Sequence, residues 1–237
     1  MKYDITININ DFDKNGLKLF GYPTILSQLG YLHLKETDQG VGVLLLDRYA
    51  WAITAMKIRI KKRVESQSDL TGKTWYSGQK GPYYRREYLI YQDSEEIILG
   101  SSYSILLDVI DRSVFRGREF PFIMLDANNK HLLELRSSYK KKVNSQEIMK
   151  RQVYNSYIDV LGHTNHLRYV EFIYDALTIE EIEEVNRYNT LELFFQHEMT
   201  LGDIFSVNKG YDNDNVVFIL YNETKDNIAF TIVLSNE

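Results

Sequence analysis

The sequence predicts an α+β protein built from two similar halves, each with one helix and an antiparallel sheet. The chain has 237 residues, which is long enough for two domains of ordinary size. Its 18 Tyr and 11 Phe favour strands. Each half shows the same order: a short strand that ends in Asp-x-x-Gly, a helical apolar pattern, and several runs of alternating apolar and polar residues. This recurrence predicts two α+β units in one chain.

The first half covers residues 1–136 and begins with the turn Asp13-Lys14-Asn15-Gly16. A helical pattern follows over residues 23–36, and the later segments alternate as strands do. The turn composition of Tyr91-Gln92-Asp93-Ser94 predicts an antiparallel hairpin. The predicted strands run over residues 52–62, 73–77, 83–91 and 97–108.

The second half covers residues 151–237 and repeats this order after the turn Asp159-Val160-Leu161-Gly162. The predicted helix spans residues 165–177, where apolar residues recur at helical spacing. Thr178-Ile179-Glu180-Glu181 is a capping box, which predicts a short helix over residues 179–185. The predicted strands run over residues 189–196, 203–209, 216–221 and 228–234.

A polar stretch over residues 137–150 separates the halves and has the composition of a linker. One helix followed by four or five antiparallel strands predicts a helix in the concave face of a sheet, as in a hotdog fold. We therefore expect a tandem hotdog fold, in which each repeat is a long helix wrapped by an antiparallel sheet. The length of the repeat indicates duplication of one unit rather than a solenoid. Two unrelated α+β domains are the alternative.

Composition excludes several classes of function. The chain has no cysteine, which rules out disulfides, thiolate metal sites and cysteine nucleophiles. Its formal net charge of −5 gives no reason to expect nucleic acid. The first residues lack the apolar run of a signal peptide, and no segment approaches the ~20 apolar residues that span a bilayer. We expect a cytoplasmic protein without stable membrane insertion.

Basic residues nevertheless cluster in three groups. Each group is either a solvated face or a docking surface for an acidic partner, which would act over about 8 Å at physiological salt. The groups are Lys57, Arg59, Lys61, Lys62 and Arg63; Arg112, Arg116 and Arg118; and Lys140, Lys141, Lys142, Lys150 and Arg151.

The segment Asp-Val-Leu-Gly-His-Thr-Asn-His-Leu-Arg-Tyr, which starts at Asp159, carries the strongest functional signal. It resembles the signature Asp-x-Asn-x-His-Val-Asn-Asn-x-x-Tyr of the acyl-ACP thioesterase family, with matches at Asp159, His163, Asn165 and Tyr169. The resemblance extends over most of the chain. Further matches are Trp51, Thr74-Trp75, Arg85-Arg86, residues 102–108, Tyr174-Asp175, Leu191-Glu192-Leu193, Glu198 and Gly202-Asp203.

The resemblance implies hydrolysis of fatty acyl-ACP thioesters to free fatty acid and holo-ACP, with no metal and no cofactor. The implied partner is acyl carrier protein with a phosphopantetheine-linked acyl chain, and either a monomer or a homodimer would suffice. Family members carry a catalytic Glu at the position that matches Glu198, which is therefore the first candidate for the base. Glu198 follows the apolar run Leu193-Phe194-Phe195, where we expect partial burial.

The residues themselves agree with this chemistry. Gly162 allows a sharp turn, and the N–H groups from about His163 onward would open a helix whose positive end can bind an oxyanion. Hydrolysis also needs a base. His163 would orient the water or polarise the carbonyl. Asp159 would fix the loop and His163, or act itself as base or nucleophile.

Two positions depart from the family pattern. The family Asn two residues after the Asp is Leu161 here, and leucine cannot hydrogen-bond. A weaker enzyme, or one that uses another polar group, would follow. Met199 stands where some members have Cys, and other members lack that Cys.

The first repeat has Leu17 and Leu19 where the second has His163 and Asn165. This contrast predicts that the second repeat carries out catalysis and that the first binds the acyl chain. The candidate substrate-binding residues are Asn165, Gly162, Trp51 and Trp75.

Three alternative functions stay open: a hotdog thioesterase that acts on acyl-CoA, a hotdog hydratase or dehydratase, and a non-catalytic acyl-binding or regulatory protein. Hydratases place Asp and His at a different spacing, and Leu161 is compatible with lost turnover. His163, His166, His197 and Glu198 do not have a recognised zinc spacing.

Overall fold

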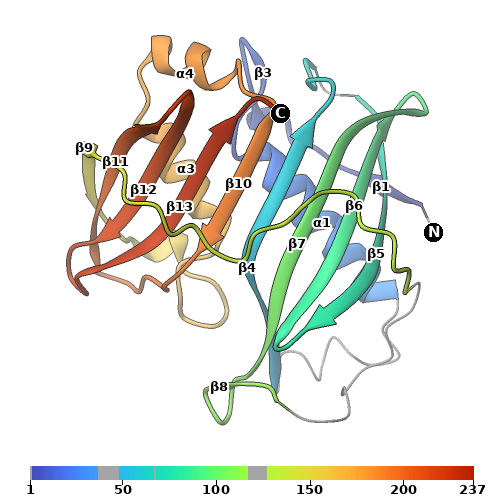
Figure 1. The fold of residues 1–237 in the computed structure, drawn as a ribbon, viewed down its shortest axis with the longest axis horizontal. Helices are drawn as coiled ribbons and strands as arrows, with labels where there is room; N and C mark the ends of the chain where they lie inside the picture. Colours follow the sequence, from blue (N-terminus) through green and yellow to red (C-terminus); the bar gives the residue numbers. More distant parts are fainter. Residues whose placement is uncertain (1, 37–47, 67, 117–126) are drawn as a thin grey trace.

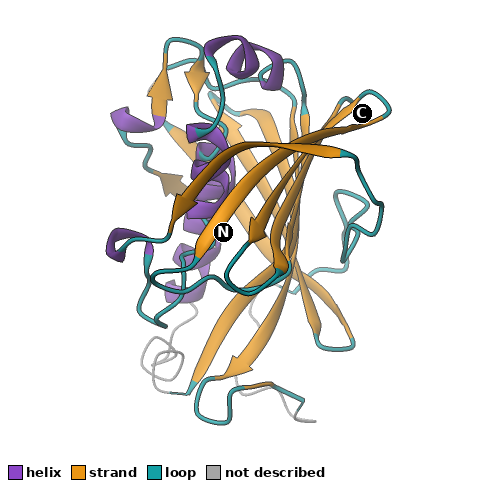
Figure 2. Ribbon diagram, turned by 90° about the vertical axis from the view of Figure 1, so that its left-hand side faces the viewer, coloured by secondary structure: helices purple, strands orange, loops and turns teal. Residues whose placement is uncertain are grey.

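One continuous antiparallel sheet of 11 strands runs through the described part of the molecule and curves around the helices (Figure 1). The structure is a computed structural model, and it describes residues 2–36, 48–66, 68–116 and 127–237. Figure 2 shows that the helices lie on one side of this sheet. The sheet is therefore the common wall of both halves.

The first half contains the predicted helix and strands, with one small hairpin before the helix. The helix α1 begins two residues earlier than predicted. The elements are β1 Tyr3–Ile5, η1 Ile9–Asp11, β2 Phe12–Asp13, β3 Gly16–Leu17, α1 Gly21–Glu36, β4 Tyr49–Ile60, β5 Leu70–Lys80, β6 Tyr83–Gln92, β7 Glu95–Asp108 and β8 Ser113–Val114.

The second half repeats this series. Its first helix, α3, is shorter than the predicted span 165–177, whereas α4 has the predicted bounds and the predicted Thr178 cap. The elements are β9 Ser145–Gln152, η2 Asn155–Tyr157, α3 Arg168–Asp175, α4 Ile179–Val185, β10 Thr190–Phe195, β11 Ile204–Asp212, β12 Asn215–Asn222 and β13 Asn227–Ser235.

The two halves meet where β4 pairs antiparallel with β10. Counted outward from this seam, the order is β4, β7, β6, β5, β1 on one side and β10, β13, β12, β11, β9 on the other. The same order on both sides, with one helix against each half-sheet, confirms the tandem hotdog fold. Met56 lies opposite Leu193 in the pairing, so apolar residues hold the seam.

The predicted linker, residues 137–150, is partly wrong. Its last residues belong to β9, which pairs with β11 at the edge of the sheet and is the counterpart of β1. Apart from Ile148 and Met149, the side chains of β9 are polar, and all are at least partly exposed, as is common for edge strands. This polarity resembles that of a linker. Residues 127–144 cross the outer face of the sheet before β9 (Figure 1).

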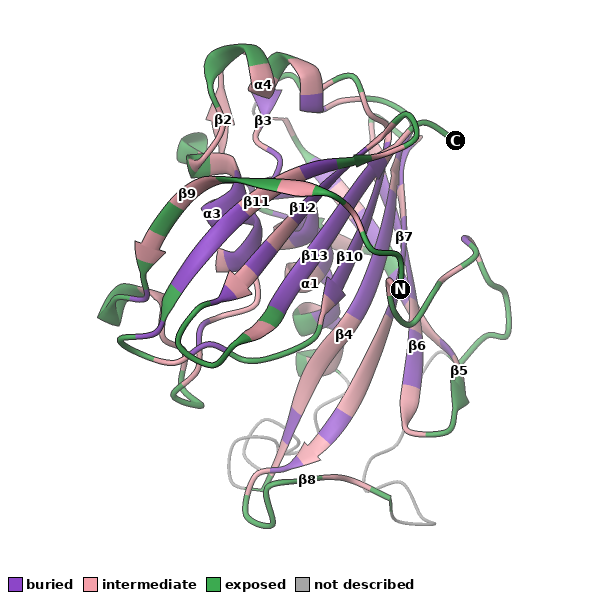
Figure 3. Ribbon diagram, turned by 60° about the vertical axis from the view of Figure 1, so that its left-hand side comes forward, coloured by how far each residue is buried: buried purple, intermediate pink, exposed green. Residues whose placement is uncertain are grey.

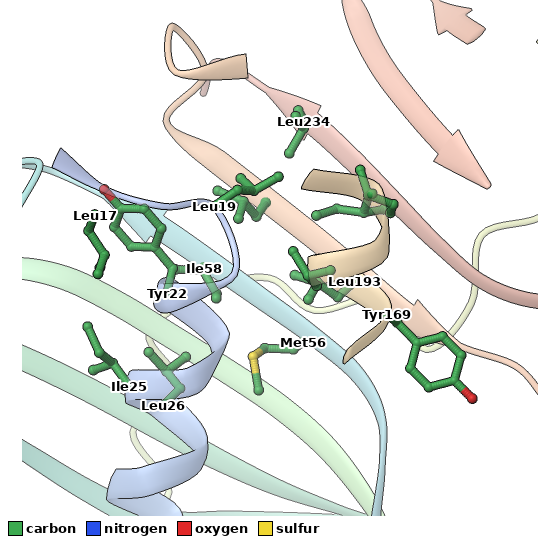
Figure 4. Packing of buried hydrophobic residues seen from close by; sticks show 14 of the residues in the cluster. Leu17, Leu19, Tyr22, Ile25, Leu26, Met56, Ile58, Tyr169, Leu193 and Leu234 are labelled. Carbon is green, nitrogen blue, oxygen red and sulfur yellow. The ribbon is translucent and has the colours of Figure 1, made fainter. Parts of the chain in front are cut away.

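Both helices pack their apolar faces into the concave side of the sheet. Tyr22, Leu26 and Leu29 of α1 are buried there, as are Val170 and Phe172 of α3. The buried residues of both halves form one hydrophobic cluster, which Figure 4 shows around β4 and β10. Figure 3 shows that β10 and β13 are mostly buried, whereas the first half of β4 is mostly intermediate. None of the described helices is both long enough and apolar enough to cross a membrane.

Replacing Leu193 by alanine tests the seam. Leu193 is fully buried in β10, so the change removes packed atoms and leaves a cavity. We expect a loss of about 2–5 kcal/mol in the free energy of unfolding, measured by urea denaturation. Val160→Ala is the control, because Val160 is 86% exposed and should change stability by less than about 0.5 kcal/mol. Similar losses in both variants would contradict the packing at the seam.

Candidate functional site

The turn from Asp159 to His163 is held by the carboxylate of Asp159. Its Oδ1 accepts hydrogen bonds from the N–H groups of Leu161 at 2.8 Å and His163 at 3.4 Å. Gly162 has φ of 80°, which a side chain rarely tolerates, so glycine is needed for the turn. The turn therefore aims the His163 side chain by means of backbone geometry.

His163 meets Glu198, which comes from the turn after β10. His163 Nε2 lies 3.2 Å from Glu198 Oε2. The two side chains are 38% and 58% exposed, so the expected partial burial of Glu198 is wrong: Glu198 lies beyond the end of the strand. A neutral imidazole can donate to one carboxylate oxygen and leave the other free to accept a proton.

A cavity of about 230 Å³, called here the site cavity, lies beside this pair. One wall is the start of β4, with Trp51 and Ile53, and another is the turn at Asp159 and His163. Glu198 completes it from the end of β10. The cavity also touches Leu161, whose side chain stands where a polar group would reach the pair.

A second cavity of about 270 Å³, called the inner cavity, lies between α1 and the concave face of the first half-sheet. Ser27 and Leu34 of α1 and Tyr84 of β6 contribute to its wall, which is mainly apolar. Trp51, Ile53 and His166 line both cavities, so these three residues form the throat between them. Trp51 packs edge-on against Tyr84 at 5.1 Å between ring centroids.

A third cavity of about 450 Å³, called the mouth cavity, also touches the pair of His163 and Glu198. It shares His163, Glu198 and Leu161 with the site cavity and is also lined by Arg112 and Ser113. The three cavities therefore form a row. The mouth cavity meets the site cavity at His163 and Glu198, and the site cavity meets the inner cavity at the throat.

His166 belongs to the site, although the sequence analysis gave it no role. Burial lowers its pKa to about 4, with the nearby Asp159 acting in the opposite direction, so the ring is neutral at pH 7. Its Nε2 lies 3.1 Å from Ser27 Oγ, which links the loop before α3 to α1. The partner on a distant helix is not visible in the local sequence pattern.

Three predicted substrate-binding residues, Gly162, Asn165 and Trp75, line none of these three cavities. Trp75 donates its indole N–H to Lys130 O at 3.0 Å on the outer face of the sheet, and its neighbour Tyr76 lines the inner cavity instead. Strand neighbours point to opposite faces, so the prediction chose the wrong member of the pair. Asn165 Oδ1 accepts from Leu167 N at 3.0 Å and stabilises the turn into α3.

The expected oxyanion site at the helix end is wrong. The helix α3 begins at Arg168, not near His163. The N–H groups of Thr164 and Asn165 already donate to Met199 O and Tyr157 O, at 2.8 and 2.9 Å. These donors are used by the fold and are not free for a substrate oxygen.

The internal repeat is shifted by one residue at the turn. Phe12 pairs with Leu17 in the first repeat, whereas Ile158 pairs with Thr164 in the second. The second turn is thus one residue longer, and Leu17 corresponds to Thr164 rather than to His163. By the same shift Leu19 corresponds to His166. His163 is the additional residue, which is why the first repeat has no counterpart to it.

Most of the basic groups are neutralised by carboxylates. The first group pairs with Glu192, Glu237, Glu96 and Glu95, and three members of the third group pair with Asp212, Glu223 and Asp175. Arg118 lies outside the described residues. Arg112 lines the mouth cavity and forms no ion pair with any described residue. Across the described segments, no group of three or more His, Asp or Glu could hold a metal ion.

Comparison with known proteins gives a family and a fold. The family model "Acyl-ACP thioesterase N-terminal domain" matches residues 1–119, half of the chain. No curated protein matches the chain in sequence.

Two solved structures resemble the whole chain. An acyl-ACP thioesterase from Bacteroides thetaiotaomicron has a TM-score of 0.83 at 17% identity, with 100% of this chain and 97% of that chain covered. A 12:0-ACP thioesterase from Umbellularia californica has a TM-score of 0.73 at 12% identity, with 99% and 96% covered. At such identities these similarities show the shared fold.

The neutral state of His166 gives a prediction for pH. Below about pH 6.5 the unfolded chain binds a proton at this ring, and the folded chain does so only near pH 4, so stability falls as pH drops through this window. His166→Gln should lose less stability over the same range, measured by urea denaturation between pH 4 and 7. His197→Gln, at an exposed histidine on the site cavity, is the control and should keep the wild-type slope. An unchanged slope in His166→Gln would contradict a buried neutral ring.

Proposed function

The chain belongs to the acyl-ACP thioesterase family, and from this premise we propose that it hydrolyses fatty acyl-ACP to free fatty acid and holo-ACP. The observation that carries the proposal is the pair of His163 and Glu198 at the centre of the row of cavities. A thioester at this pair has space for the pantetheine arm on one side and for the acyl chain on the other. We therefore place the proposed reaction centre at His163 and Glu198.

Glu198 is the proposed base. Its Oε2 lies 3.2 Å from His163 Nε2, and its Oε1 takes a proton from a water molecule as the water oxygen attacks the thioester carbonyl. The tetrahedral intermediate then breaks the carbon–sulfur bond, and the proton on Glu198 goes to the departing thiolate. The products are the carboxylic acid and the free thiol, and the carboxylate of Glu198 is restored.

Asp159 has a positioning role in this proposal. Its Oδ1 holds the backbone of the turn that carries His163, and the carboxylate lines the site cavity without touching Glu198. The alternative in which Asp159 is the base or the nucleophile would use its Oδ2, because both hydrogen bonds of the turn go to Oδ1. The hydrogen bonds to Leu161 and His163 favour the first role.

Leu161 replaces the family Asn at the rim between the site and mouth cavities. Its side chain is 39% exposed and offers no hydrogen bond, so the pair has one polar neighbour fewer. We propose that His163 alone orients Glu198, with a lower turnover as the consequence. This is also the one feature that favours the non-catalytic alternative.

The first repeat is the proposed acyl-binding half and the second the catalytic half. The inner cavity lies under α1 of the first repeat, and the pair comes from the second. Trp51 and Ile53 of β4 would contact the chain as it passes the throat. In the first repeat Leu17 and Leu19 are buried in the core, which leaves that turn without reactive side chains.

The proposed partner is acyl carrier protein rather than coenzyme A. Arg112 lines the mouth cavity and forms no ion pair with a described carboxylate. Most lysines and arginines of the first and third basic groups do form such ion pairs. A cation beside the entrance suits the phosphate of the pantetheine arm, which coenzyme A also carries, and the acidic surface of a carrier protein, which coenzyme A lacks.

Glu198→Gln should reduce kcat on acyl-ACP by about 10²-fold or more, because the amide cannot take the proton from water. The assay is release of free thiol from acyl-ACP at saturating substrate. Glu147→Gln, on the exposed edge strand β9, is the matched control and should keep the wild-type rate. Unchanged turnover in Glu198→Gln would move the base to Asp159, and no turnover by the wild type on ACP or CoA thioesters would favour the binding alternative.

Arg112→Glu should raise KM for acyl-ACP about tenfold, with a smaller effect on acyl-pantetheine, which lacks the phosphate and the protein. The effect should shrink as salt increases, because exposed charges are screened. Lys141→Glu is the control, since Lys141 already pairs with Asp212. Equal changes for both substrates would count against a carrier-protein contact at the mouth.

A further inference from the structure

The throat between the site cavity and the inner cavity is polar on one side. Trp51 and Ile53 of β4 present apolar surface to it, and His166 faces it from the loop before α3. Phe195 packs edge-on against the imidazole at 5.8 Å between ring centroids. His166 thus brings an imidazole into the throat opposite the side chains of Trp51 and Ile53.

One nitrogen of this ring has no protein partner. Nε2 lies 3.1 Å from Ser27 Oγ. No described group hydrogen-bonds to Nδ1. Protein atoms do not fully cover Nδ1, so a ligand atom can reach it. Burial lowers the pKa of His166, so both nitrogens belong to a neutral ring with one donor and one acceptor. Because the Ser27 hydroxyl can donate or accept, Nδ1 can take either role.

The position along the substrate follows from the order of the cavities. In the proposed function the thioester carbon would lie at His163 and Glu198 in the site cavity, and the tail would lie in the inner cavity. The carbons that pass His166 are therefore those just after the carbonyl. A methylene there would displace water from Nδ1 and leave this nitrogen without a hydrogen-bond partner, which is unfavourable.

We propose that the throat selects acyl groups with an oxygen on carbon 3, a 3-hydroxyacyl or 3-oxoacyl thioester, through a hydrogen bond to His166 Nδ1. The proposal rests on the proposed function and names the substrate class of the same site. A hydroxyl would donate to Nδ1 and an oxo group would accept from it, with Ser27 adjusting the tautomer. Trp51 and Ile53 would pack against the carbon chain on the opposite side.

The test compares three acyl-ACP substrates of equal chain length that carry a 3-hydroxyl, a 3-oxo group or no substituent. The wild type should show kcat/KM at least about tenfold higher for one or both oxygenated substrates than for the plain one, because a site with a buried polar group discriminates against a ligand that leaves it unpaired. His166→Phe keeps a ring but removes the hydrogen bond, and the ratio should fall to about one.

Two further variants separate loss of the hydrogen bond from loss of folding and from a general change in the site cavity. His166→Gln retains a hydrogen-bonding group and should retain part of the ratio, even if His166→Phe folds poorly. His197→Phe is the matched control, because this ring also lines the site cavity but its Nδ1 already hydrogen-bonds Ile228 O at 2.8 Å. The control should keep the wild-type ratio.

A wild-type ratio of one or below, or a high ratio that persists in His166→Phe, would overturn the proposal. Binding of the corresponding free acids, measured by calorimetry, separates this outcome from failure of the proposed function. Tighter binding of the oxygenated acid that is lost in His166→Phe would support the throat assignment even in a protein without turnover. Turnover without a preference for oxygenated substrates in either assay would support the proposed thioesterase function and contradict the proposed selectivity at His166.

Discussion

The antiparallel pairing of β4 with β10 is the contact on which the site depends. The register sets Ala55 opposite Phe194, so the earlier residues of β4 run past the end of β10. Trp51 and Ile53 therefore lie beside the turn that carries Glu198. A slip by one residue would turn their side chains to the other face of the sheet and close the passage between the halves. Neither repeat alone contains both the inner cavity and the pair of His163 and Glu198.

Duplication explains how the halves divided their work. Both repeats use a carboxylate-held turn before a helix, with Asp13 Oδ1 accepting from Asn15 N in one and Asp159 Oδ1 accepting from Leu161 N in the other. The additional residue in the second turn is His163. Where the first turn continues into the core with Leu17, the second projects an imidazole towards Glu198. A local change of one residue thus separates a structural turn from a reactive one.

The sequence alone predicts the fold and the central pair, and it fails where distant contacts decide. Alternation and capping locate the strands and α4, and the Asp-to-Tyr segment identifies Asp159 and His163. The face on which Trp75 lies depends on the position of β5 within the sheet, which local alternation leaves open. The role of His166 depends on Ser27 from a helix far away in the chain. The exposure of Glu198 depends on where β10 stops, and strand ends are the least certain part of a sequence-based assignment.

The central claim is that an acyl chain crosses from the reaction centre in the second repeat into the first. A structure of the protein with an acyl-pantetheine thioether, which cannot be hydrolysed, tests this most directly. The sulfur should lie beside His163 and Glu198, with the chain passing between Trp51 and His166 into the inner cavity under α1. A chain that lay under α3, or a sulfur remote from Glu198, would contradict the account.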